Sequence, residues 1–93
     1  MPPEEMLSQL HELARRAGIE VRIDPFDLRS IEGRGGLCWL RGRPVVVMDA
    51  GMPLIDKVGV LASALAEFDL EPLCVPPVLR RRIRRRPPKS HRP

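Results

Sequence analysis

The chain has 93 residues, of which 43% are hydrophobic and 30% are charged, and a chain of this size forms one small domain. The apolar stretches 44–48 and 58–66 are shorter than the roughly 18 residues of a membrane span, so we expect no transmembrane helix. Residues 1–5 lack the positive start and apolar run of a secretory signal, and we therefore expect a cytoplasmic protein.

Charge is distributed unevenly along the chain. Residues 1–79 carry eight basic side chains against all twelve acidic ones, a net charge of −4, whereas residues 80–93 carry eight basic side chains and no acidic one. The overall net charge of +4 is thus the average of an acidic body and a very basic tail. We predict a domain over 1–79 followed by an Arg-rich C-terminal tail over 80–93.

The N-terminal part of the chain predicts a helix followed by a strand. Between Pro3 and Ala17, hydrophobic residues recur every three or four positions, which is the period of one helix face. Gly18 then provides a stop for the helix. Over 19–24 hydrophobic and charged residues alternate, the pattern of a strand with one solvent-exposed face.

A β-hairpin is predicted next. Two apolar runs, 37–40 and 44–48, are joined by Arg41-Gly42-Arg43, which has the length and composition of a hairpin connection. Both alternating sets of side chains in these runs are apolar, so both faces of the sheet need cover. A second helix is predicted over 53–68, where a hydrophobic stripe of helical period would face the sheet.

The end of the chain predicts a short extended segment over 69–75 and a basic helix that begins at Pro76-Pro77. The expected fold is α+β: a small three-stranded, mostly antiparallel sheet packed by two helices, in the order α-β-β-β-α, plus the short C-terminal basic helix. Both longer helices are expected on one face. We expect the other face to be covered either by the C-terminal helix, through Val78, Leu79 and Ile83, or by a second copy of the chain.

For the second case we predict a homodimer, since a body this small has little margin of stability alone. The expected interface residues occupy alternate positions in the two hairpin strands and are Leu37, Trp39, Val45 and Val47.

Candidate catalytic and metal-binding residues are few. Cys38 lies in an apolar run, and we interpret it, like Cys74, as a reduced and buried thiol. His11 lies off the hydrophobic stripe of the first helix, and His91 lies near the C-terminus. Cysteine and histidine occur at no spacing that would aim two ligands at one ion, so we predict no metal, no cofactor and no catalytic residue.

Residues 35–49, with Gly35-Gly36-Leu37-Cys38 at their start, followed by the helix 53–68, resemble a pattern in short uncharacterised bacterial proteins. More loosely, the hairpin and helix are similar to the core of ImmA/IrrE metallopeptidase-like domains. In those peptidases the helix after the hairpin carries H-E-x-x-H. The corresponding helix here has no histidine, so the resemblance implies a metal-free relative that keeps the shape without the peptidase activity.

The C-terminal tail is the segment with the plainest physical role. A dense run of arginines repels itself, and it either stays solvated or meets an anionic partner, most commonly nucleic acid. The tail has no aromatic side chain to stack on bases, so we expect binding to DNA or RNA without sequence specificity. The predicted contact residues are the basic ones: Arg80, Arg81, Arg82, Arg84, Arg85, Arg86, Lys89 and Arg92.

We therefore predict a small, non-catalytic bacterial binding or adaptor module, dimeric, with a tail that contacts nucleic acid or another polyanion such as an acidic protein. One alternative is a protein interaction module that uses the apolar sheet face. Another is a thiol or hydrolytic enzyme centred on Cys38, which would require a histidine or carboxylate beside it.

Overall fold

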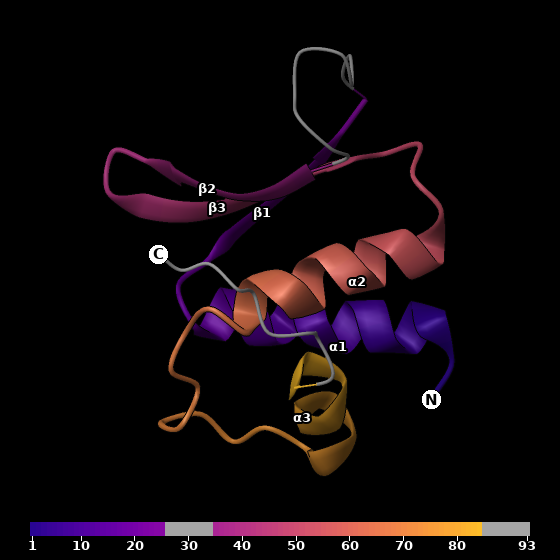
Figure 1. Cartoon of the computed structure of the whole chain (residues 1–93), viewed down its shortest axis with the longest axis vertical. Helices are drawn as coiled ribbons and strands as arrows, with labels where there is room; N and C mark the ends of the chain where they lie inside the picture. Colours follow the sequence, from indigo (N-terminus) through magenta and orange to yellow (C-terminus); the bar gives the residue numbers. More distant parts are fainter. Residues whose placement is uncertain (26–34, 85–93) are drawn as a thin grey trace.

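The computed structural model describes residues 1–25 and 35–84, and within them the fold is α+β, as predicted (Figure 1). The three strands form one sheet, and the helices lie on one side of it. In chain order the elements are α1 (Pro3–Arg16), β1 (Glu20–Asp24), β2 (Gly35–Leu40), β3 (Arg43–Asp49), α2 (Leu54–Leu65) and α3 (Pro77–Arg84).

Helix α1 begins and ends as its sequence indicates. Glu4 and Glu5 lie in its first turn and Arg15 in its last, where each charge opposes the helix dipole. The chain leaves the helix through Gly18, whose φ of 82° is in the left-handed region that favours glycine. On the exposed surface, a hydrogen bond from Arg15 lowers the pKa of Glu12, with Nη2 and Oε2 2.6 Å apart.

The sheet has the strand order β1-β3-β2, so the last strand in sequence is central. β3 is antiparallel to β2, its hairpin partner, and parallel to β1. The sheet is therefore mixed, and the expected antiparallel pairing holds for the hairpin. Alternation of hydrophobic residues predicts which face of a strand is buried, but not which strands lie next to it. The position of β3 between β1 and β2 therefore could not be predicted from that pattern.

The hairpin turns through two residues rather than three. Arg41 and Gly42 have φ of 54° and 79°, the pair of positive values that a type I′ turn requires, and Leu40 pairs with Arg43. Odd-numbered residues of β2 therefore lie opposite even-numbered residues of β3.

This register separates the four residues expected to form a dimer interface. Leu37 pairs with Val46, and residues paired across strands project to the same side, so Leu37 and Trp39 lie on the face of Val46. Val45 and Val47 lie on the other face. The expectation that all four share one face is wrong, because the shorter turn shifts one strand by a residue and a shift of one residue exchanges the faces.

Helices α1 and α2 pack side by side against one face of the sheet, which confirms their expected position (Figure 1). α3 packs on α1 and α2, on the side away from the sheet, so its expected alternative role as a cover for the second sheet face is wrong. No helix within the described ranges is long and apolar enough to cross a membrane. The core is formed by Leu10, Leu13, Ala14, Ile19, Val46, Met48, Met52, Val58, Leu61, Ala62, Ala64, Leu65, Leu79 and Ile83.

Candidate nucleic-acid interface

Helix α3 attaches the start of the basic run to the body. Leu79 and Ile83 are four residues apart and therefore project from the same helix face, where they are buried in the core with exposed fractions of 2% and 6%. Pro76 accepts hydrogen bonds from the amides of Leu79 and Arg80, which closes the first turn. The arginines between the two buried residues consequently have fixed positions on the surface.

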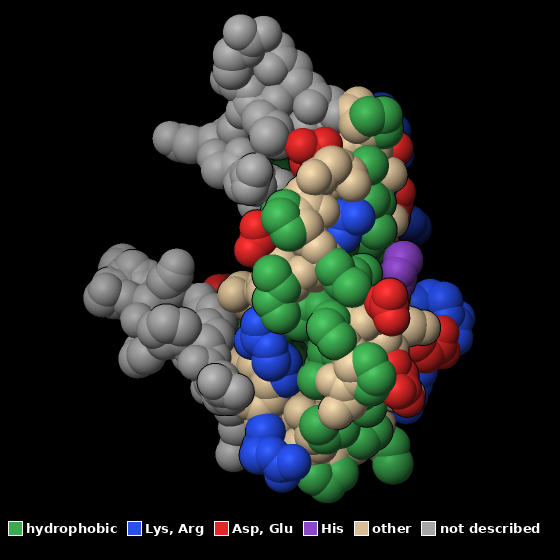
Figure 2. All heavy atoms as spheres, turned by 90° about the vertical axis from the view of Figure 1, so that its right-hand side faces the viewer, with side chains coloured by type: hydrophobic (Ala, Val, Ile, Leu, Met, Phe, Trp, Pro, Cys, Tyr) green, Lys and Arg blue, Asp and Glu red, His purple; other side chains and the backbone are tan. Residues whose placement is uncertain are grey.

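Arg80, Arg81 and Arg82 are the arginines of α3 whose side chains are described, and their surroundings differ. Arg81 is exposed, whereas Arg80 and Arg82 are half-buried against the body. The guanidinium of Arg82 lies across α2, where a β-carbon added to Gly59 would be 3.6 Å from its Nη2 atom. Arg80 faces the loop after α2, with Nη1 3.9 Å from Oε2 of Glu71. Figure 2 shows basic side chains in the lower part of the molecule, at the level of α3 in Figure 1.

The rest of the predicted basic set lies at or beyond the end of the described chain. Arg84 is the last residue of α3, and its side chain is not among those described. Arg85, Arg86, Lys89 and Arg92 lie outside the described residues. The expected boundary between residues 79 and 80 falls inside α3, and the buried Ile83 lies beyond it.

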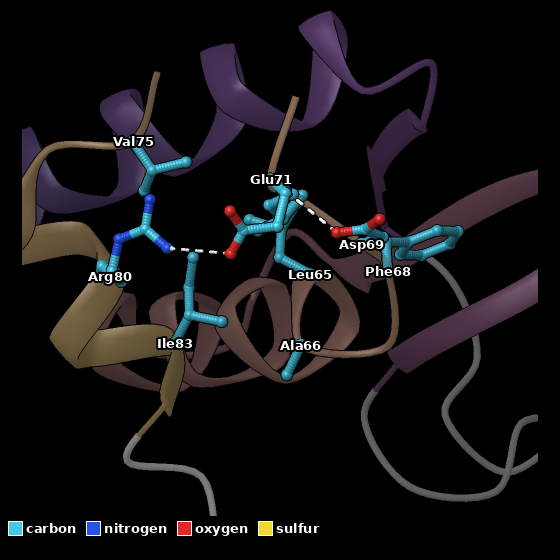
Figure 3. Close-up of a pocket in the computed structure, with 9 residues that line it drawn as sticks. Leu65, Ala66, Phe68, Asp69, Glu71, Val75, Arg80 and Ile83 are labelled. Carbon is cyan, nitrogen blue, oxygen red and sulfur yellow. Dashed lines mark hydrogen bonds and ion pairs between the residues drawn. The ribbon is translucent and has the colours of Figure 1, made fainter. Parts of the chain in front are cut away.

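A pocket of about 320 Å³ lies between the end of α2, the following loop and α3 (Figure 3). Pockets that bind small molecules begin at about this size. Six of its nine lining residues are hydrophobic, and its charged residues are Arg80 and two loop carboxylates. The lining residues are Leu65, Ala66, Phe68, Asp69, Leu70, Glu71, Val75, Arg80 and Ile83.

The charged groups of this pocket are arranged around Glu71. Its carboxylate faces the Arg80 guanidinium, as Figure 3 shows, and its backbone amide donates to Oδ1 of Asp69 at 3.0 Å. The Glu71 side chain is 81% exposed and that of Arg80 38% exposed. The ring of Phe68 also lies near that of Trp39, with ring centroids 6.1 Å apart, within the usual range for aromatic pairs.

Sequence reasoning identified Arg80 but missed the pocket. The segment 69–75 was expected to be extended, and the described chain has turns there instead. The signal present in the sequence was the pair of acids Asp69 and Glu71, which alternate with apolar residues immediately before the basic helix. Nothing local in that pattern indicates that Arg80 folds back toward it.

Cys38 and Cys74 are free and exposed, so the expectation that they are buried is wrong. β2 is an edge strand, and Cys38 projects from the face opposite to α1 and α2. Its Sγ atom is 4.0 Å from the carbonyl oxygen of Gly36, and Cys38 does not line the pocket. Within the described residues, no three His, Cys, Asp or Glu side chains are grouped so as to hold a metal ion.

No protein-family model matches the chain, and comparisons with curated proteins and with solved structures found no match. The resemblance of the hairpin and following helix to ImmA/IrrE-like domains and to short bacterial proteins therefore stays a prediction.

Proposed function

We propose that the chain is a non-catalytic binding module whose C-terminal arginines bind nucleic acid, or another polyanion, without sequence specificity. The observation that carries this proposal is the anchoring of α3. Leu79 and Ile83 hold the helix on the body while Arg81 points to solvent, so the basic run starts at a defined place on the surface.

The distribution of charge favours polyanion binding by the C-terminal segment rather than by the body. The body up to residue 79 has a net charge of −4 and would repel a polyanion, whereas the segment after it has eight positive charges and no negative one. Binding of phosphates by such a segment releases counterions, and its affinity falls steeply with salt. With up to about eight phosphate contacts, the log-log slope against salt concentration approaches roughly −7.

The test is binding of the full chain to random-sequence duplex DNA and to single-stranded RNA between about 50 and 300 mM salt. We expect Arg81→Gln to reduce the salt slope by about 1, because one phosphate contact is lost. Arg16→Gln, an exposed arginine on α1, is the matched control and leaves the slope unchanged. Equal effects of the two variants, or no binding by the full chain at the lowest salt, would contradict the proposal.

We further infer that the chain forms a homodimer through the outer edge of β2, with which no other strand of the described residues pairs, instead of the sheet face. The two edges of the sheet differ in chemistry: β1 carries Glu20, Arg22 and Asp24, charges that discourage pairing with another strand. On β2, Cys38, Trp39 and Leu40 are exposed, the last two by 61% and 53%. An exposed apolar edge strand is a template for a further strand.

The hairpin register indicates which amides can pair with another strand. Leu40 and Arg43 close the turn as a hydrogen-bonded pair, so the backbone groups of Leu37 and Trp39 point away from β3. Antiparallel pairing about a two-fold axis at Cys38 would place Trp39 of each copy opposite Leu37 of the other copy. This self-complementarity favours a second copy of the chain over an unrelated strand.

Sedimentation of Trp39→Pro and Trp39→Leu tests the dimer. Both variants lose the indole, but only proline loses the outward N–H donor. We expect Trp39→Pro to be monomeric and Trp39→Leu to retain the dimer, while circular dichroism checks that both are folded. A monomeric wild-type chain at about 100 μM, or loss of the dimer in both variants, would contradict edge pairing.

A further inference from the structure

The pocket between α2, the loop that follows it and α3 contains an ion pair that is too long to be a hydrogen bond. Arg80 Nη1 and Glu71 Oε2 are 3.9 Å apart, beyond the distance at which an N–H donor and an oxygen acceptor bond directly. The two groups attract each other, but each keeps hydrogen-bonding capacity for a third group. Both line the pocket, and Figure 3 shows their head groups turned toward one another.

The remaining lining completes a site with two distinct parts. The half-buried Phe68 and Val75 provide its apolar surface, and the buried core residues Leu65 and Ile83 lie behind them. At its rim, the charges are one cation and two carboxylates, of which Asp69 already accepts the Glu71 amide through Oδ1. A purely anionic ligand would meet Glu71, and a purely cationic one would meet Arg80. A ligand that carries both charges side by side complements the rim without displacing either residue.

We propose that this pocket binds an apolar α-amino acid. Its carboxylate pairs with Arg80, its ammonium group with Glu71, and its side chain packs on the apolar surface of Phe68 and Val75. One carbon atom separates the two charged groups of an α-amino acid, which suits an Arg80 and a Glu71 that lie in adjacent positions. Charge-assisted hydrogen bonds of this type are about twice as strong as neutral ones. The pocket volume, about 320 Å³, is large enough to admit a ligand of this size.

Trp39 provides an optical readout of the site through its contact with Phe68. It is the only tryptophan of the chain, which has no tyrosine, and its ring lies 6.1 Å from that of Phe68 on the pocket wall. L-Leucine is the probe, because it absorbs no light in the range of tryptophan fluorescence. We expect leucine to change the Trp39 fluorescence of the full chain with saturation, and to shift the backbone amide resonances of Glu71, Val75 and Arg80.

Three analogues of leucine test the three parts of the site. Isocaproate lacks the ammonium group, leucinol lacks the carboxylate and glycine lacks the side chain. We expect each to bind at least about tenfold more weakly than leucine, since each loses one complementary contact. Equal affinity for any of the three overturns the proposal, as does the absence of any change with about 10 mM leucine.

Two charge-neutralising variants locate the site. Glu71→Gln changes an exposed loop residue and should leave the fold intact while weakening leucine binding about tenfold. Arg80→Gln should have a similar effect. Arg81→Gln removes the same charge one position along α3, outside the pocket, and should leave leucine binding unchanged. If Glu71→Gln binds leucine as the wild type does, the proposal is overturned, whatever the result for nucleic acid.

Discussion

Strand β2 and helix α3 have opposite compositions, and their burial is the reverse of what composition suggests. β2 reads GGLCWL and has no charged residue, yet Cys38, Trp39 and Leu40 are exposed. α3 reads PVLRRRIR and half of it is arginine, yet its Leu79 and Ile83 belong to the core of the protein. In this small fold, the place of an element decides burial more than its composition does.

The physical reason lies in what each element has beside it. Within residues 1–25 and 35–84, β2 is at the edge of a sheet with helices on one side, so no helix of this part of the chain covers its outer edge or its second face. α3 rests on two helices, and two apolar residues one turn apart are enough to join them. Arg80 and Arg82 are half-buried beside these two residues, as expected for arginines that lay the apolar part of their side chains on a protein surface.

The largest effect on stability is expected from truncation within α3. A chain that ends at residue 79 loses five of the eight residues of the helix, including the buried Ile83, whereas one that ends at residue 84 keeps the whole helix. We expect thermal unfolding of the 1–84 chain to resemble that of the full chain and the 1–79 chain to be strongly destabilised or unfolded. Equal melting temperatures for the two would mean that the basic segment is peripheral from residue 80 onward.

A point substitution isolates the core contact from the length of the helix. Ile83→Ala should lower the free energy of unfolding by about 2 to 5 kcal/mol, because it leaves a cavity in the core. Arg81→Ala, on the exposed side of the same helix, should change it by no more than about 0.5 kcal/mol. Urea denaturation of both variants measures the difference. Similar values for the two would show that α3 does not depend on its buried face.

The sequence predicted most of the elements and few of their contacts. Hydrophobic periodicity located the helices near 3–17 and 53–68, and alternation located β1, since those signals are local. The order β1-β3-β2, the two-residue turn and the packing of α3 on helices depend on neighbours distant in sequence. For the site, the charge count marked Arg80 to Arg82, but the approach of Arg80 to Glu71 follows from the path of the loop.

A smaller effect is expected on α2, beneath Arg82. Gly59→Ala should raise the free energy of unfolding by about 0.5 to 1 kcal/mol, because alanine costs less backbone entropy in a helix. The added β-carbon would lie 3.6 Å from Arg82 Nη2, an ordinary contact. Ser63→Ala, on the exposed side of α2, is the control for helix propensity alone. A loss of stability confined to Gly59→Ala would show that Arg82 must lie closer to α2 than a methyl group permits.

The smallest effect is expected on β2. Cys38→Ser exchanges an exposed thiol for a hydroxyl that water can solvate, so the free energy of unfolding should change by no more than about 0.5 kcal/mol. Its cross-strand partner Val45 is 3% exposed, and Val45→Thr should cost about 1 to 3 kcal/mol because it buries a hydroxyl. Urea denaturation at low protein concentration measures both without a contribution from dimerisation. If Cys38→Ser costs as much as Val45→Thr under those conditions, the edge strand is covered within the single chain, and the contrast between β2 and α3 disappears.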